Sequence, residues 1–482
     1  MKHRQLLTKY CGDAPFWKVT LRLAIPIALQ NLLISSLALV DTLMVGQLGD
    51  VQLASVGMAG QWSWLMNLVL FGIASGTSMF ISQYWGVGDI KSIHKTYGIA
   101  LCSSVAVAMV FTIVGIVLDN EVLSVFNQDP RVIGYGTKYI QIAAFSYVAL
   151  AISSTMSVLL RATENVKLPM YIAFCTTVMN AILNYGLIFG ELGMPEMGVQ
   201  GAALATSLSS WTGVVLLFLF SYKQKNILIA PIQNIFKFTK NEFTLFFRKA
   251  LPVIFNEGSW GLGTVLFNII FSNLGYEYYA SITILKTFEG LVFVFFNGLC
   301  SACCVMVGKS IGRGKIERGM LDAKRFSFLI PFSALVLGVV VALSNHTLVS
   351  LFNLQGNLTE TTLHASQGII IIYGLHLMVR NIPYAQIVGI FRSGGDTTTG
   401  MKFDLFCLWL LSLPMTYVCA YVLKLPFVLT YAIMYIFEDY PKAILCIRHF
   451  ISMKWIRPVT KDGQMALEAM KNLSKKEATN NK

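Results

Sequence analysis

Long, nearly uncharged apolar stretches recur along this chain of 482 residues, and each can cross a bilayer core of about 30 Å. Only 13% of the residues are charged, about half the share typical of soluble proteins. In lipid every backbone N–H and C=O must be bonded within the protein, which leaves helices or closed barrels. The stretches are too long and continuous for barrel strands, so the sequence predicts an all-α polytopic membrane protein.

The apolar stretches divide into twelve predicted transmembrane helices. They cover approximately residues 16–47, 52–83, 97–118, 136–160, 168–190, 199–221, 244–273, 279–308, 326–350, 365–390, 401–423 and 427–450. The first is too long for a cleaved signal peptide and has no small-residue cleavage site, so we expect it to remain as a helix.

The formal net charge of +13 is concentrated on one side of the predicted membrane. Lys and Arg gather in the N-terminal tail, in every second loop and in the C-terminal tail, whereas the opposite loops hold only Arg131, Lys138 and Lys424. Cytoplasmic loops carry this excess. The pattern predicts that both termini are cytoplasmic and that the basic loops face anionic lipid headgroups, with no nucleic-acid partner.

The two halves of the chain resemble each other at a nearly constant offset. The matching pairs are Arg22…Pro26 with Arg248…Pro252, Leu48-Gly49 with Leu274-Gly275, Gly86-x-Gly88 with Gly312-x-Gly314, and, at a slightly larger offset, Arg161-Ala162 with Arg392-Ser393. Six spans per half make the repeats parallel. We expect two six-helix lobes around a central cleft: an N-terminal repeat (1–221), a cytoplasmic linker (222–247), a C-terminal repeat (248–457) and a polar cytoplasmic tail (458–482).

The Gly-x-Gly pairs do not indicate nucleotide binding. They follow membrane spans rather than β-strands, and the sequence has no P-loop Lys-Ser/Thr signature. Helix ends and tight turns explain these glycines. Without visible machinery for ATP hydrolysis, we expect transport driven by an ion gradient, with no cofactor.

Asp41 lies deep in the first span, with no basic residue within a turn or two along the chain. An ionisable group inside a membrane helix is costly and therefore a functional candidate. Asn180 and Asn184 share one face of the fifth span, and amide oxygens suit a hard cation. Together these residues predict a site for Na⁺ or H⁺; the alternative is hydrogen-bonded packing between helices.

The second half has its own candidate site. Glu257 and Trp260 lie about one turn apart in the seventh span, and an acid beside an aromatic ring suits an organic cation. Glu289 in the eighth span is a further candidate; the alternative is that it forms a mutually neutralising pair with Lys286 one turn before it.

Other charged residues in the second half are interpreted differently. Asp404 is expected near the membrane interface, Glu438 and Asp439 beside Lys442 are interpreted as structural, and Arg380 is expected to pair with one of the acids.

Pro26 and Pro252 occupy matching places in the two repeats. Each removes a helical hydrogen bond and allows its helix to bend, so both are candidate conformational residues.

Several segments resemble motifs of the multidrug and toxic compound extrusion (MATE) family. They are Val40-Asp41-Thr42-Leu43-Met44-Val45-Gly46 with Pro26 upstream, Asn180 to Gly190, Gly198 to Thr206, Leu251 to Glu257, and Met306 to Gly312. The resemblance runs from about residue 16 to 455 and is closest to the bacterial NorM-type branch in the N-terminal repeat.

The resemblance implies a secondary active multidrug efflux antiporter in the bacterial inner membrane, which exports organic cations in exchange for Na⁺ or H⁺. It places the coupling site on Asp41, Asn180, Asn184 and Thr206, and the acidic helix-seven position on Glu257. NorM-type members carry an acid in helix ten, which this sequence lacks. Whether Glu257, Glu289 and Asp404 form a second ion site stays open. We expect a monomer.

Three other kinds of membrane protein fit the sequence less well than an antiporter. The first is a lipid-linked oligosaccharide flippase or metabolite exporter of the same superfamily. A flippase would need more cationic residues in the cleft, to hold pyrophosphate, than Lys286 and Arg380 provide. A membrane enzyme finds no support, because the sequence has no HExxH, no paired histidines within a span and no nucleophile motif. A channel is disfavoured by duplicated lobes with single buried acids.

Overall fold

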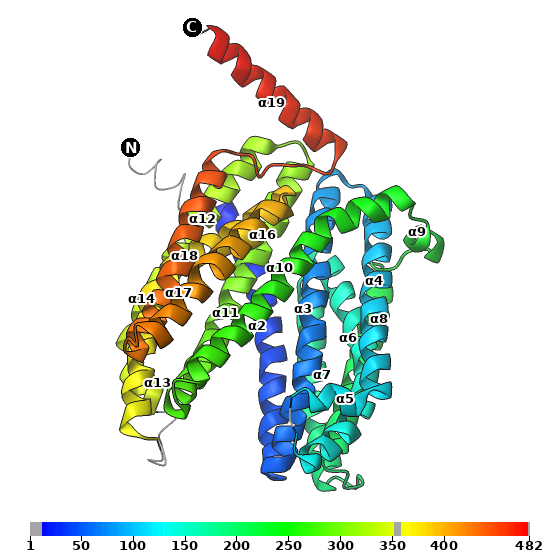
Figure 1. The fold of residues 1–482 in the computed structure, drawn as a ribbon. Coiled ribbons are helices and arrows are strands. Elements are labelled where there is room, and N and C mark those ends of the chain that lie inside the picture. Colours follow the sequence, from blue (N-terminus) through cyan, green and yellow to red (C-terminus); the bar gives the residue numbers. More distant parts are fainter. Residues whose placement is uncertain (1–11, 127, 351–357, 481–482) are drawn as a thin grey trace. The chain divides into compact units, whose positions relative to one another are not determined.

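The computed structural model describes residues 12–126, 128–350 and 358–480. Residues 1–11, 127, 351–357 and 481–482, which include both predicted cytoplasmic ends, lie outside this description. The described chain is helical, apart from turns and one isolated bridge between Gly395 and Ile456 (Figure 1).

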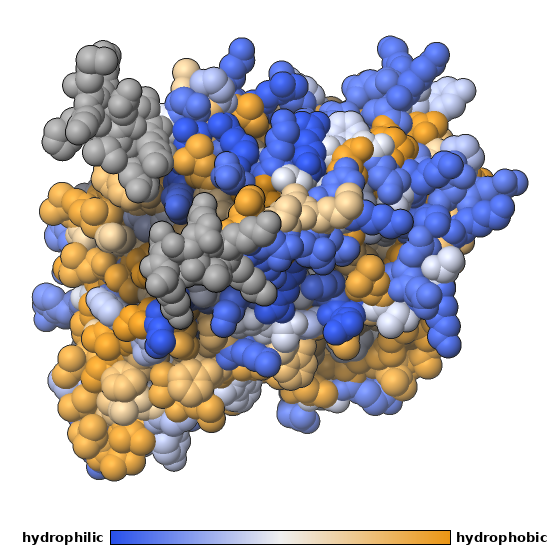
Figure 2. All heavy atoms as spheres, turned by 90° about the horizontal axis from the view of Figure 1, so that it is seen from above, coloured by the Kyte–Doolittle hydropathy of each residue, from blue (hydrophilic) through white to orange (hydrophobic). Residues whose placement is uncertain are grey.

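Ten helical segments are long and apolar enough to cross a membrane. Helices α10 (Lys240–Ser272) and α18 (Phe427–Ile451) have the length as well, although α18 carries Glu438, Asp439 and Lys442 in its interior. Together they account for the twelve predicted spans. Seen from the end at which α19 (Lys461–Asn480) lies, hydrophilic side chains cover much of the surface, and hydrophobic ones gather mainly at the left and lower edges of the view (Figure 2).

The chain divides into two compact units, called here the N-lobe (Ile25–Ile254) and the C-lobe (Met1–Ala24 with Phe255–Lys482). The predicted linker lies inside the N-lobe, so the compact units do not divide where the sequence repeats do. The repeat boundaries at residues 221 and 248 stay a prediction.

The N-lobe is a bundle in which α6 packs against α3, α4 and α8, and α7 packs against α8. Its helices are α2 (Ala14–Gly46, from Ile25), α3 (Asp50–Val87), α4 (Ile90–Val117), α5 (Asp119–Ser124), α6 (Pro130–Ala162), α7 (Lys167–Phe189), α8 (Val199–Gln224), α9 (Ile232–Phe236) and the first part of α10. Local signals set the helix ends. Asp89 caps α4 by accepting from the Ser92 N–H at 3.0 Å, and Asp129 with Pro130 begins α6.

The C-lobe is built around α14, which packs against α11, α12 and α18. Its other elements are the rest of α10, α11 (Tyr276–Gly312), α12 (Ile316–Leu343), α13 (Asn345–Ser350), α14 (Glu360–Tyr384), η1 (Ala385–Phe391), α15 (Arg392–Gly394), α16 (Thr397–Leu405), η2 (Phe406–Ser412), α17 (Leu413–Tyr417), η3 (Val418–Val422), α18 and α19. The three η segments are π-helical turns inside the predicted tenth and eleventh spans. Such turns frequently occur at functional sites.

The internal duplication is visible in backbone conformation. Gly88 and Gly314 follow α3 and α11 with φ of 73° and 74°, and Gly49 and Gly275 precede the same helices with φ of 124° and 147°. A positive φ favours glycine, because it has no Cβ. The interpretation of these glycines as helix ends and turns is confirmed.

Helices α2 and α10, which contain Pro26 and Pro252, each belong to both compact units, and the boundary between the units falls close to these prolines. In the C-lobe, Thr20 of α2 donates to Met306 Sδ at 3.6 Å. In the N-lobe, the Phe246 ring of α10 stacks on Phe80 of α3 at 5.7 Å. The repeat offset carries Thr20 onto Phe246 and Phe80 onto Met306, so the two contacts are equivalent.

Candidate functional site

The structure brings together the four residues predicted for the N-lobe ion site. Asp41 lies on α2, Asn180 and Asn184 lie on α7, and Thr206 lies on α8. Three helices that are separate in sequence therefore meet around one carboxylate.

A chain of hydrogen bonds connects these residues. Asn184 Nδ2 donates to Asp41 Oδ1 and, at 2.9 Å, to Asn180 Oδ1. Asn180 Nδ2 donates in turn to Ser209 Oγ at 3.2 Å and to Thr206 Oγ1 at 3.5 Å. Ser209 was missed from the sequence. Its position three residues after Thr206, on the same helix face, was the available signal.

The site holds acceptor oxygens that are not fully used. Asn180 and Asn184 are completely buried. Asn184 Oδ1 is buried and, within the described residues, accepts no hydrogen bond. No basic side chain in the described chain forms an ion pair with Asp41. A partly buried carboxylate and a free amide oxygen are suitable ligands for a monovalent cation.

The donor set of the N-lobe ion site combines one carboxylate with neutral amide and hydroxyl oxygens. No group of three His, Cys, Asp or Glu side chains is placed to hold a metal within the parts of the chain that the structure describes. One carboxylate with neutral oxygens matches the predicted transported ion, Na⁺ or H⁺, in charge.

Glu257 of α10 forms an ion pair in the C-lobe. Its Oε1 accepts a hydrogen bond from Arg392 Nη2 at 2.7 Å, and Arg392 is only 3% exposed. Glu257, which was predicted to bind the substrate, is therefore neutralised by Arg392, which follows the predicted tenth span.

Glu289 of α11 is also paired, although not with Lys286. Arg380 Nη2 of α14 donates to Glu289 Oε1 at 2.7 Å, and the Arg380 guanidinium lies 4.9 Å from the centre of the Tyr435 ring. Lys286 Nζ instead donates to Asn268 Oδ1 at 2.7 Å. The predicted acidic partner of Arg380 is thus Glu289.

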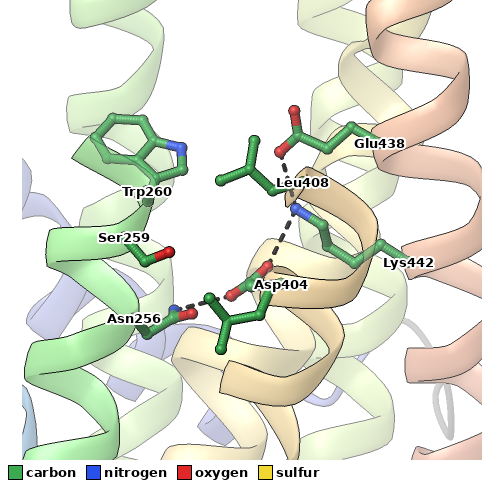
Figure 3. A pocket seen from close by; sticks show the side chains of 8 residues that line it. Asn256, Ser259, Trp260, Asp404, Leu408, Glu438 and Lys442 are labelled. Atoms are coloured by element: carbon green, nitrogen blue, oxygen red, sulfur yellow. Dashed lines mark hydrogen bonds and ion pairs between the residues drawn. The ribbon is translucent and has the colours of Figure 1, made fainter. Parts of the chain in front are cut away.

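Trp260 lines a small pocket within the C-lobe, together with Asn256, Asp404, Glu438 and Lys442 (Figure 3). Lys442 Nζ of α18 binds Asp404 Oδ1 at 3.1 Å and Glu438 Oε1 at 3.0 Å. Asp404 Oδ2 also accepts from Asn256 Nδ2 at 2.8 Å. Asp404 was expected at the membrane interface; the structure places it in this polar cluster beside the predicted substrate residue.

The comparisons with known proteins agree with this architecture. A family model described as MatE matches residues 26–186 and 252–418, which together exceed half of the chain. A probable multidrug resistance protein NorM of Thermotoga maritima is 24% identical over 407 residues, covering 83% of this chain and 85% of that protein. The probable multidrug resistance protein YoeA of Bacillus subtilis is 23% identical, covering 87% and 90%.

Solved structures show the same fold. A crystal structure of MATE in the bent conformation superposes with a TM-score of 0.80 at 17% identity, covering 97% of this chain and 98% of that one. The Vibrio cholerae MATE transporter VcmN in its bent form has a TM-score of 0.80 at 16% identity, covering 95% and 98%. These are twelve-helix, two-lobe transporters, and the chain is a multi-pass membrane protein that belongs to the MatE family.

Proposed function

We propose that this protein is a secondary active multidrug efflux antiporter that exports organic cations in exchange for Na⁺ or H⁺. The observation that carries the proposal is the Asp41 site, in which a carboxylate without a basic partner meets two buried amides. The names of the relatives, which are probable multidrug resistance proteins, support the choice of substrate.

In the proposed cycle Asp41 takes up the ion while the site is open outward, and the organic cation leaves. Ion binding changes the hydrogen bond between Asn184 and Asp41 and so the position of α2 beyond Pro26. The emptied carrier turns inward, releases the ion and binds another organic cation. The membrane potential contributes about 2.3 kcal/mol per charge per 100 mV.

The proposed location is the bacterial cytoplasmic membrane, with both termini in the cytoplasm and the protein as a monomer. The one-sided distribution of Lys and Arg in the loops supports this orientation. We expect no enzymatic activity, no cofactor and no nucleic-acid partner.

A lipid-linked or metabolite substrate in the same superfamily is the alternative. A pyrophosphate group would need unpaired cations in the membrane interior. Arg380, Arg392 and Lys442 each bind a carboxylate, and Lys286 alone of these cations binds a neutral amide, so the geometry favours a cationic substrate over an anionic one.

The test is ethidium efflux from a pump-deficient bacterium that expresses the protein, with sodium and acid pulses applied separately. We expect one pulse to drive efflux, and Asp41→Asn to reduce this to the level of cells without the protein. Asp119→Asn is the matched control, because Asp119 is also a buried N-lobe aspartate and accepts from Gln141 at 2.6 Å. Full ion-driven efflux by a well-expressed Asp41→Asn protein would refute the assignment.

A further inference from the structure

Acidic side chains outnumber basic ones in the interior of the C-lobe. We call the following set the C-lobe charge network: the acids Glu257, Glu289, Asp404, Glu438 and Asp439, and the bases Lys286, Arg380, Arg392 and Lys442. Five carboxylates face four cations, and Lys286 is both solvent-accessible and bound to Asn268. If all five acids are deprotonated and all four bases are protonated, the network carries a net negative charge.

The described ion pairs engage Arg380, Arg392 and Lys442, and they leave one acid of the network without a cation. Arg392 is bound to Glu257, Arg380 to Glu289, and Lys442 to both Asp404 and Glu438. Asp439 has no such pair within the described chain. It is 2% exposed, and its Oδ2 atom is buried without a hydrogen-bond partner.

Asp439 interacts electrostatically with other members of the network. The charged groups in electrostatic reach are Glu438 and Lys442 of α18, Arg380 of α14 and Glu289 of α11. Asp404 of α16 joins them through Lys442. The titratable His376 of α14 also packs against α18, with its ring 5.8 Å from those of Tyr435 and Tyr440. The remaining elements packed against α18 (η1, η2, α17 and η3) carry no Asp, Glu, Lys, Arg or His; their titratable side chains are Cys407, Tyr417, Cys419 and Tyr421.

A buried carboxylate without a partner is strongly destabilised, and its usual solution is to bind a proton. Sodium is a poor alternative here, because it needs several oxygens. The Asp404 and Glu438 oxygens already face Lys442 and Asn256. We propose that Asp439, together with the adjacent Glu438, holds an exchangeable proton in the C-lobe, at a site separate from Asp41.

The C-lobe proton has a direct consequence for substrate binding. The pocket beside Trp260 is bordered by Glu438 and Lys442, so an organic cation whose charged group reached this pocket would compensate the same surplus charge (Figure 3). The carboxylic acid would then release its proton to water and become a carboxylate, so charge is conserved. This consequence rests on the proposed antiport function, whereas the existence of the proton does not.

Infrared difference spectroscopy of the purified protein, titrated with acid, tests the site without any transport step. All variants carry Asp41→Asn, which removes the N-lobe carboxyl. We expect a carboxylic-acid C=O stretching band that is lost in Asp439→Asn. The matched control is Asp322→Asn: Asp322 is 3% exposed but has Arg318 at 3.3 Å and Arg325 at 3.6 Å, so the band should persist. An unchanged band in Asp439→Asn overturns the proposal.

Two further variants keep the test decisive if Asp439→Asn does not fold. Glu438→Gln removes the coupled acid and should also abolish the band, because the two carboxyls titrate as a pair. Lys442→Met removes a cation and should increase the band about twofold, since a second acid then needs a proton. A band insensitive to both variants overturns the proposal. Because no efflux is measured, failure here is distinct from failure of the antiport function.

Discussion

Arg392 Nη2 lies 2.7 Å from Glu257 Oε1, and this contact joins two residues that are 135 positions apart in the chain. Arg392 follows the tenth span at the place where Arg161 follows the fourth, so the repeat supplies an arginine in both lobes. In the C-lobe this arginine neutralises the acid of helix seven. A substrate contact at Glu257 stays a prediction, and it would require the substrate to compete with Arg392.

Breaking this pair should destabilise the C-lobe. Arg392→Met leaves Glu257 buried without its partner, and we expect a loss of about 3–5 kcal/mol in the free energy of unfolding. The double variant Arg392→Met/Glu257→Gln should recover a large part of it, because no unpaired charge remains. Thermal unfolding of the detergent-solubilised protein measures both. Additive losses in the double variant would contradict a direct pair.

Asn184 should tune the ion site without carrying its charge. Asn184→Ala removes the donor to Asp41 and the free Oδ1 acceptor. A hydrogen bond to a charged group contributes about 1.5–3 kcal/mol, so we expect about a tenfold higher ion concentration for half-maximal efflux. Ser210→Ala is the control, since its hydroxyl donates only to the Thr206 carbonyl at 2.7 Å. An ion dependence equal to that of the wild type would exclude Asn184 from the site.

The close approach of α12 and α14 should depend on glycine. A Cβ on Gly374 would lie 2.5 Å from the Gly338 carbonyl oxygen, so Gly374→Ala should force the helices apart and cost about 1–3 kcal/mol. A Cβ on Gly290 of α11 would meet no atom within 4 Å. Gly290→Ala should therefore be neutral or stabilise the helix by up to about 1 kcal/mol. Thermal unfolding compares the two; equal stability would contradict the packing argument.

The sequence was informative where the signal is local or repeated. The hydropathy of the sequence locates the spans. The offset between the two halves pairs Gly88 with Gly314, and the two glycines share the same backbone conformation in the structure. The residues of the N-lobe ion site could be predicted for the same reason. Asp41 is the lone acid in an apolar span, and Asn180 and Asn184 are one helical turn apart.

The sequence does not show which charged residues from different spans form ion pairs. Asp404 and Lys442 lie in different spans, and only packing of α16 against α18 brings them within 3.1 Å. The choice between Lys286 and Arg380 as the partner of Glu289 likewise depends on how α11 meets α14. The polar tail gave no hint that it forms α19, nor that Thr460 donates to the Gly312 carbonyl at 2.7 Å.

The loop between α15 and α16 should make stability depend on acid. Asp396 caps α16, and its carboxylate contacts His449 Nε2 at 2.8 Å and Arg457 Nη1 at 3.2 Å. Burial raises the pKa of the Asp396 carboxyl, but the hydrogen bonds from His449 and Thr399 and the charge of Arg457 outweigh it and leave this pKa below its usual value. A carboxyl with a lowered pKa stabilises the fold fully above its unfolded pKa of about 3.9, and this contribution is lost as the pH falls below that value.

The melting temperature of the wild type should therefore drop on acidification below about pH 4 more steeply than that of Asp396→Asn. Asp396→Asn should already be less stable at neutral pH, by about 1–3 kcal/mol, because the amide keeps the α16 cap but weakens the contacts with His449 and the half-exposed Arg457. Asp129→Asn is the comparison, since the ion pair of Asp129 with Arg131 is exposed to solvent and should contribute little to stability at any pH. If Asp396→Asn melted with the same pH profile as the wild type, the acid sensitivity would have to arise elsewhere, and the contacts of Asp396 would serve only to hold the turn in place.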